Sequence, residues 1–225
     1  MLAGPGLPRD ADSHAQRIYG KGFPLAAGTM EAVVRLAAFA SAMEVCDPAL
    51  GAHAERVAAN AEAVARRLGW GEERLERLRV GAALHDVGKV NIRPEVLSKP
   101  GTLDALELAE MRAHPVEGLW LLAGVPSLAP ALPYVLFHHE RWDGFGYPTR
   151  RAGELIPLEG RILAVVDAFD AMTSVRPYRP SRTPAEAAEE VRRCAGSQFD
   201  PTVADAFLDA LGAGEVTCGH TAVAA

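Results

Sequence analysis

Apolar residues recur about one helical turn apart along most of the chain, and no segment alternates strongly enough to require a β-strand. The range Met30–Val45 shows this period clearly. Asp47-Pro48 then ends it, because proline disfavours helical backbone at the residue before it. The period returns after Pro48 and persists to about Leu211. We therefore predict an all-α fold, a bundle of roughly seven to nine helices.

Residues suited to helix ends divide this pattern into separate helices. We expect helices over residues of about 48–68, 72–86, 102–122, 127–140, 158–174, from 184 onward and 201–211. Gly88 is expected to end the helix that precedes it, and Thr102 to cap the next one. Thr183-Pro184-Ala185-Glu186 has the form of a capping box, and Asp200-Pro201 is expected to start the last helix.

Stretches without a helical period predict the domain organisation. Residues 142–157 are rich in Gly and Pro and form a predicted loop that is longer than most connections, which favours a functional segment. Residues 1–28 are expected to be a flexible segment or the remnant of a linker. Residues 29–212 then form one domain, and residues 213–225 a C-terminal tail.

Composition narrows the choice of partners and of compartment. The net charge of −6 argues against a nucleic-acid backbone or an anionic membrane as the main partner. The longest apolar runs are too short to span a bilayer, and the N-terminus lacks the features of a signal peptide. Cys46, Cys194 and Cys218 are scattered, which is typical of reduced thiols. We expect a cytoplasmic location.

The histidines suggest the chemistry. Four short segments hold five of the seven histidines: His53 in GAHAERV, His85 in LHDVGK, His114 in MRAHPVEG, and His138 and His139 in FHHERWDGFGYP. Asp86 and Asp167 add two carboxylates on apolar segments. Imidazoles and carboxylates together are the ligands of hydrolytic transition-metal sites. So many of these groups on helical, apolar segments indicate a metal cluster inside the bundle.

Each of these groups alone has a plainer interpretation. His85 and Asp86 lie about 100° apart around a helix axis, so both can face one point only near a helix end; a capped helix end with a solvated Asp86 is an equally good explanation of the pair. His53 and His114 alone are more often surface or structural residues, and paired core histidines are common. Asp167 differs, because burying an unpaired carboxylate is costly. A metal or an arginine would offset that cost, also for Asp170 on the same face.

Taken together, the seven groups suit two cations that share Asp86, since a carboxylate has two oxygens and can bridge. Two metals about 3.5–4 Å apart can activate water and stabilise a phosphoryl transition state. Mixed nitrogen and oxygen ligands favour Fe or Mn over a thiolate zinc site.

These segments also carry a family resemblance. The chain resembles the HD-GYP domain family, a branch of the HD phosphohydrolase superfamily: LHDVGK is similar to the HD motif and HHERWDGFGYP to the motif that names the branch. The segments MRAHPVEG, IPLEGRILAVVDAFDAMTS, RPYR and QFDP match in order and spacing, and the match covers Met30–Leu211.

The resemblance implies an HD-type helical bundle with a long GYP loop and a centre of two or three metals. It implies hydrolysis of a cyclic dinucleotide, usually cyclic di-GMP, to the linear dinucleotide or on to GMP by a metal-bridging hydroxide. By position, one metal would be held by His53, His85, Asp86 and Asp167. The second would be held by Asp86, His114, His138 and His139.

The resemblance also assigns the substrate contacts. Lys89 would act beside Asp86 in catalysis by reaching a phosphate oxygen, and Arg176 and Arg179 in RPYR would clamp the other phosphate, which suits the bidentate guanidinium. Asp143 and Tyr147 belong to the loop segment that would line the pocket.

The chain departs from the family pattern at two places. Some members carry a glutamate that holds a third metal four residues before the first histidine; here that residue is Ala49, so we expect two metals. The family usually has a glycine two residues after GYP, whereas here Arg150 and Arg151 follow Thr149, which changes the loop or adds phosphate contacts.

Two other functions are compatible with the same fold. One is a catalytically weak signalling module that binds a nucleotide or a protein, and the other is an HD phosphohydrolase for another nucleotide. A purely structural helical scaffold is the plainest alternative. The expected partners are a cyclic dinucleotide substrate, signalling proteins and a second copy in a homodimer, with no DNA or RNA and no membrane insertion.

Overall fold

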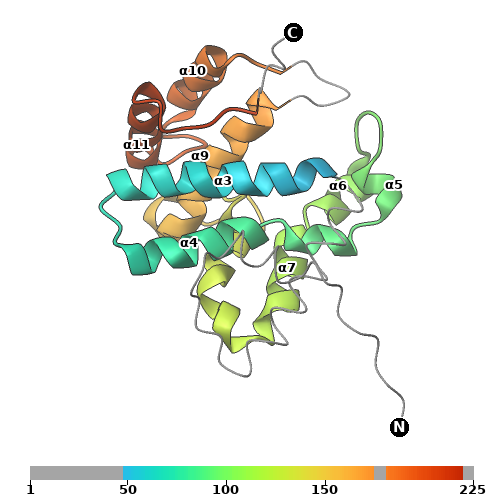
Figure 1. Ribbon diagram of the computed structural model, residues 1–225. Helices are drawn as coiled ribbons and strands as arrows, with labels where there is room; N and C mark the ends of the chain where they lie inside the picture. Colours follow the sequence, from blue (N-terminus) through green and yellow to red (C-terminus); the bar gives the residue numbers. More distant parts are fainter. Residues whose placement is uncertain (1–47, 175–180, 220–225) are drawn as a thin grey trace. The chain divides into compact units, whose positions relative to one another are not determined.

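The structure is a computed structural model that describes residues 48–174 and 181–219, and these residues are helical, with no β-strand among them (Figure 1). Residues from Ala52 onward form one compact unit. The all-α prediction is confirmed for this part of the chain. The predicted helix over Met30–Val45, the predicted segment 1–28 and the predicted boundary at residue 29 lie outside the described residues.

Most of the helices follow one another with short connections. In chain order they are α3 (Pro48–Arg67), α4 (Glu72–Leu84), α5 (Pro94–Leu97), α6 (Ala105–Met111), α7 (His114–Ala123), α8 (Leu132–Phe137), α9 (Leu158–Thr173), α10 (Pro184–Cys194) and α11 (Pro201–Gly212). Three short 3-10 helices are η1 (Val87–Asn91), η2 (Pro126–Ala131) and η3 (Gly153–Leu155). None of the described helices is both long and apolar enough to cross a bilayer.

The core forms where the apolar stripes of α3, α4, α9, α10 and α11 meet. On α3, Val57, Ala61 and Val64 recur about one turn apart and are fully buried. In the same core, the Phe169 ring of α9 contacts the Phe207 ring of α11 with centroids 4.8 Å apart. Figure 1 shows α9, α10 and α11 grouped together, and α4 running alongside α3. These packed helices fix the direction in which the ends of α3, α4 and α9 point.

Prolines shorten two of the predicted helices. The helix expected over 102–122 breaks at Arg112-Ala113, because the Pro115 ring would clash with the Met111 carbonyl in a continuous helix; α6 ends before it and α7 starts at His114. Asp104, not Thr102, caps α6, and its side chain accepts hydrogen bonds from Leu106 and Glu107. The helix expected over 127–140 is divided into η2, which contains Pro130, and α8.

Other helix ends follow the sequence directly. Thr183 and Glu186 form the predicted capping box of α10, and Asp200 caps α11 by accepting from the backbone amides of Thr202 and Val203. The start of the predicted tail packs on the core: Val216 is buried, and the Thr217 carbonyl accepts from the Asn60 side chain.

A buried carboxylate is one of the groups that hold the predicted loop between α8 and α9 in place. Glu140 is 3% exposed, and its Oε1 accepts from the Thr149 amide at 2.6 Å, the Thr149 hydroxyl at 2.7 Å and the Arg150 amide at 3.1 Å. Arg150 has φ of 56°, in the left-handed region, and is the one non-glycine residue with positive φ in the described ranges. The backbone therefore has at Arg150 the conformation that a glycine would adopt without strain.

We expect Arg150→Gly to stabilise the protein by about 0.5–1 kcal/mol, because an L-residue with a left-handed backbone costs about 1–2 kcal/mol and the added freedom of the unfolded chain offsets part of the gain. Urea unfolding of the variant would measure this. Arg151→Gly, at a position without positive φ, is the matched control and should not stabilise. If Arg150→Gly were no more stable than the wild type, the backbone at Arg150 would not be strained.

Candidate metal centre

The predicted ligands come from five segments that meet at one place in the bundle. His53 and Asp167 lie within α3 and α9, whereas the others lie at helix ends. His85 is the C-cap of α4, and Asp86 follows with φ −97° and ψ 7°, off the helical path. Adjacent residues can therefore face the same point, as the sequence predicts for a helix end. His114 is the first residue of α7, and His138 is the C-cap of α8.

Gly88 has a different role from the predicted one. It lies inside η1 and does not end α4. A Cβ at this position would lie 1.9 Å from the His114 carbonyl oxygen and 2.5 Å from the Gly118 nitrogen. Only glycine allows η1 to approach the first turn of α7 so closely. This approach brings His114 beside Asp86.

Two groups of candidate ligands share one carboxylate. Ligand atoms of Asp86, His114, His138 and His139 all lie within 4.8 Å of one another. Ligand atoms of His53, His85 and Asp86 form the other group under the same limit. The structure thus brings six of the seven predicted ligands into two sets that meet at Asp86. The seventh, Asp167, adjoins the second set, with its Oδ1 3.3 Å from His53 Nε2.

Backbone carbonyls fix which ring nitrogen of three histidines carries the proton. The Nδ1 atoms of His85, His114 and His138 lie 2.6 Å, 2.8 Å and 2.9 Å from the carbonyl oxygens of Ala82, Met111 and Val135. A carbonyl only accepts, so each Nδ1 is the donor and each neutral ring presents a lone pair at Nε2. This is the usual orientation of metal-binding histidines.

These lone pairs face one another and Asp86. His114 Nε2 lies 3.2 Å from His138 Nε2, and Asp86 Oδ1 lies 3.3 Å and 3.7 Å from these two atoms. His85 Nε2 and Asp86 Oδ1 are buried without a hydrogen-bond partner among the described residues. Acceptors held this close repel one another and lack the solvation that burial removes. A cation between them would satisfy all of them, so the residues present fit a divalent metal.

Burial and a neighbouring ammonium together set the charge states of this cluster. Burial alone would raise the pKa of Asp86, but the Lys89 ammonium is the strongest of the opposing effects, which together hold the pKa well below its usual range. Burial lowers the pKa of His138 to about 4 and lowers the pKa of His139 well below its ordinary value. At neutral pH, Asp86 is therefore ionised and both histidines are uncharged, which is the state a metal requires of its ligands.

His53 is held by two carboxylates from α9. Its Nε2 faces Asp167 and its Nδ1 lies 2.7 Å from Asp170 Oδ2. Burial lowers the pKa of His53, but the hydrogen bonds to Asp167 and Asp170 outweigh it and raise the pKa to about 9. Asp170 is 1% exposed and also accepts from Arg56, with Nε 2.6 Å from Oδ1 and Nη2 3.0 Å from Oδ2. The sequence pointed to an arginine as one partner for this face of α9, but the role of Asp170 beside His53 is visible only in the structure.

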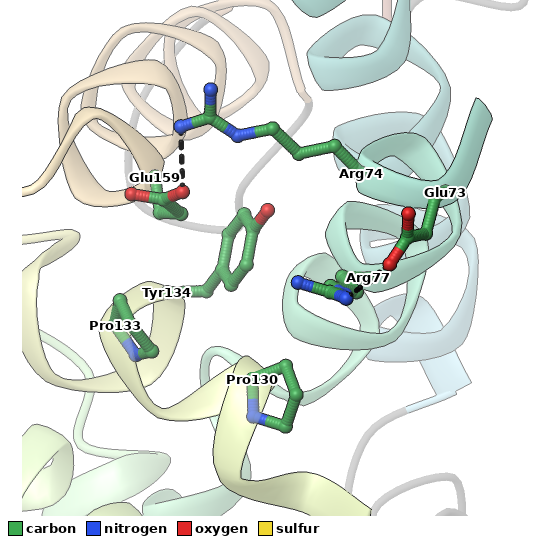
Figure 2. A pocket seen from close by; sticks show the side chains of 7 residues that line it. All are labelled: Glu73, Arg74, Arg77, Pro130, Pro133, Tyr134 and Glu159. Atoms are coloured by element: carbon green, nitrogen blue, oxygen red, sulfur yellow. Dashed lines mark hydrogen bonds and ion pairs between the residues drawn. The ribbon is translucent and has the colours of Figure 1, made fainter. Parts of the chain in front are cut away.

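A separate pocket shares no residue with this cluster. Its volume is about 330 Å³, and its lining consists of Glu73, Arg74, Arg77, Pro130, Pro133, Tyr134 and Glu159. Figure 2 shows that its charged side chains pair with one another: Arg74 with Glu159 at 2.8 Å and Arg77 with Glu73 at 2.5 Å. The four charged side chains that line the pocket therefore compensate one another. The candidate functional residues are those of the histidine cluster.

Comparison with known families agrees with this arrangement. A family model described as HD domain matches residues 38–203, most of the chain. The chain belongs to the HD domain family. Its motifs and its relatives place this HD domain in the HD-GYP branch, as the sequence predicts.

Curated relatives of this HD domain are longer proteins. It is 40% identical over 191 residues to the "Cyclic di-GMP phosphodiesterase response regulator RpfG" of Xanthomonas campestris pv. campestris, covering 84% of this chain and 50% of that protein. It is 38% identical to the "3'3'-cGAMP-specific phosphodiesterase 2" of Vibrio cholerae, covering 76% and 33%. A "Cyclic di-GMP phosphodiesterase" of Thermotoga maritima is 39% identical, with 69% and 43% covered. The chain spans half or less of the length of these relatives.

Solved structures share the fold of this HD domain. A structure titled "Bd1817, a HDG"Y"P protein from Bdellovibrio bacteriovorus" matches with a TM-score of 0.60 and 19% identity, covering 72% of this chain and 52% of that one. The "L. monocytogenes phosphodiesterase PgpH HD domain in complex with Cyclic-di-AMP" matches with a TM-score of 0.53 and 18% identity, covering 78% and 96%. At these identities the likeness shows the fold alone.

The predicted substrate contacts are placed only in part. Lys89 donates to Asp86 Oδ2, so its ammonium compensates the shared carboxylate. The Tyr147 ring stacks on the His139 ring with centroids 4.8 Å apart. Asp143 pairs with Arg141 at 2.6 Å and accepts from the Phe145 amide, which organises the loop. Arg176 and Arg179 lie outside the described residues, and the side chain of Ala49 does too.

The raised pKa of His53 gives a pH dependence in the metal-free HD domain. A protonated His53 stabilises the fold between two carboxylates; this contribution is complete below about pH 6.5 and is lost as pH rises toward about 9. In EDTA, we expect the free energy of unfolding of the wild type to fall as the pH rises across this range. The fall should exceed that of His53→Gln by up to about 3 kcal/mol. Urea unfolding at several pH values measures this, and equal slopes for both proteins would contradict the His53 assignment.

Proposed function

We propose that this HD-GYP domain is a metal-dependent phosphodiesterase that hydrolyses cyclic di-GMP to the linear dinucleotide, to GMP or to both. The observation that carries the proposal is the pair of ligand sets that meet at Asp86. Support for the substrate comes from relatives that are 39–40% identical and named as cyclic di-GMP phosphodiesterases. A relative named as specific for 3'3'-cGAMP is 38% identical, so that nucleotide is the second candidate substrate.

We further propose that the centre holds two divalent ions, Fe or Mn. His53, His85, Asp86 and Asp167 would hold one of them. Asp86, His114, His138 and His139 would hold the other. The mixed nitrogen and oxygen donors support Fe or Mn, and Ala49 in place of a further carboxylate supports two ions rather than three. When bound, the ions would supply Lewis-acid stabilisation of the phosphodiester and would activate water at neutral pH.

The chain's own residues would bind and orient the diester. Lys89 would exchange its contact with Asp86 for a phosphate oxygen, and would there stabilise the negative charge that grows on the phosphoryl group. Arg176 and Arg179 would hold the second phosphate through bidentate hydrogen bonds. Tyr147, stacked on His139, would form a wall of the pocket, with Asp143 keeping the loop in shape.

The proposal also includes the location and the partners of the domain. A cytoplasmic location, a homodimer and signalling partners are proposed with the function. The free thiols of Cys194 and Cys218 support a reducing compartment. An anaerobic assay of iron- or manganese-loaded protein would distinguish the proposed function from the two alternatives. These are a catalytically weak binding module and a phosphohydrolase for another nucleotide. The assay would compare cyclic di-GMP, 3'3'-cGAMP, nucleoside triphosphates and a generic phosphodiester, with product identification.

Asp86→Ala should abolish hydrolysis of cyclic di-GMP and reduce the bound metal, because both ligand sets lose their common member. Turnover and metal content of the purified variant would be measured beside wild type and Asp205→Ala, an exposed carboxylate on α11 that serves as the control. Turnover at the wild-type rate in Asp86→Ala would disprove the role of this residue.

Arg176→Ala and Arg179→Ala should raise KM for cyclic di-GMP more than they lower kcat, since a phosphate clamp acts mainly on binding. Steady-state kinetics of each single variant would test this. A large loss of kcat with unchanged KM would instead place these arginines in the chemical step.

A further inference from the structure

Asp170 is a buried carboxylate with several partners beside the centre, although it belongs to neither candidate ligand set. It is 1% exposed. Its two oxygens contact His53 Nδ1, the guanidinium of Arg56 and the Ser174 hydroxyl, the last at 3.1 Å. Arg56 Nη2 also donates to the Ser174 oxygen at 3.2 Å. Asp170 therefore joins α3 to the end of α9 at the point where His53 faces the cluster.

The direction of the His53 ring depends on this contact. An ionised carboxylate only accepts hydrogen bonds, so Asp170 requires the proton of a neutral His53 to be at Nδ1. The lone pair is then at Nε2, which faces Asp167 and the candidate site. The other three histidines with a defined Nδ1 partner use backbone carbonyls for the same purpose. His53 lies in the middle of α3 and uses a side chain from α9 instead.

We propose that Asp170 is the positioning residue of one metal site, which it serves by fixing His53 with Nδ1 protonated and Nε2 free to bind. Arg56 holds Asp170 in place with one hydrogen bond to each carboxylate oxygen, and His53 Nδ1 contacts Oδ2, which Arg56 Nη2 also contacts. Such partners of metal-bound histidines change metal affinity by about 10- to 100-fold when they are replaced. This inference rests on the proposed metal centre.

Asp170→Asn tests the inference because it preserves size while changing the hydrogen-bonding capacity. Asparagine has one oxygen, which the Arg56 guanidinium would claim, and its amide group would then donate to His53 Nδ1. The His53 proton would move to Nε2, where it blocks metal binding. We expect the affinity of one of the two sites to fall by about 10- to 100-fold and the other site to be unchanged.

The experiment is a calorimetric titration of metal-free protein with Mn²⁺, and it includes two matched controls. Asp200→Asn changes another buried aspartate, which pairs with Arg161 at 2.6 Å and caps α11, so it reproduces the loss of a buried ion pair. Ser174→Ala removes one hydrogen bond from Asp170 and leaves the His53 contact. Both controls should bind Mn²⁺ as the wild type does.

Each outcome has a defined meaning. Selective weakening of one site in Asp170→Asn supports the proposal, and wild-type titration of a folded Asp170→Asn overturns it. Equal weakening in Asp200→Asn also overturns it, because loss of stability would then explain the effect. A wild type that binds no Mn²⁺ would refute the proposed centre itself, which is a distinct result.

A second measurement needs no variant. In wild-type protein loaded with diamagnetic Zn²⁺ and labelled with ¹⁵N-histidine, we expect the NMR signals of His53 to show a proton at Nδ1 and none at Nε2. A proton at Nε2 of His53 would overturn the assignment even if Asp170→Asn does not fold.

Discussion

The central constraint in this protein is a set of buried acceptor atoms that face one another. Backbone carbonyls hold the imidazoles of His85, His114 and His138 so that their lone pairs are directed at Asp86 and, for two of them, at each other. Without a positive charge between them, such an arrangement is unfavourable in a buried place. The Lys89 ammonium compensates one oxygen of Asp86, while the other has no hydrogen-bond partner among the described residues. The site is therefore organised for cations.

These groups lie at or next to helix ends. The same proline that interrupts α6 and α7 frees the Met111 carbonyl, which then holds His114 in its orientation. Gly88 lets the turn after Asp86 approach α7. The arrangement therefore depends on the packed core of α3, α4, α9, α10 and α11, which sets where the helices end.

The sequence predicted what depends on local pattern. The all-α class, the capping box at Thr183, the start of α11 at Asp200 and the loop after His139 all follow from neighbouring residues. It also identified histidines and aspartates that the structure brings together, since ligand-type residues on apolar segments are informative before any contact is known.

What the sequence did not predict depends on contacts between distant segments. Gly88 was interpreted as a helix end, because a close approach between η1 and α7 leaves no local signal. Thr102 and Asp104 both suit a helix start, and only the packed structure selects Asp104. The roles of Asp170 and Glu140 are set by partners on other elements, so the sequence shows their polarity and not their function.

Anomalous diffraction from crystals of the manganese-loaded protein would show whether cations bind between these acceptor atoms. We expect two peaks per chain, about 3.5–4 Å apart, with Asp86 between them and the Nε2 atoms of His85, His114 and His138 directed at them. A single peak away from Asp86, or none at full manganese loading, would contradict it.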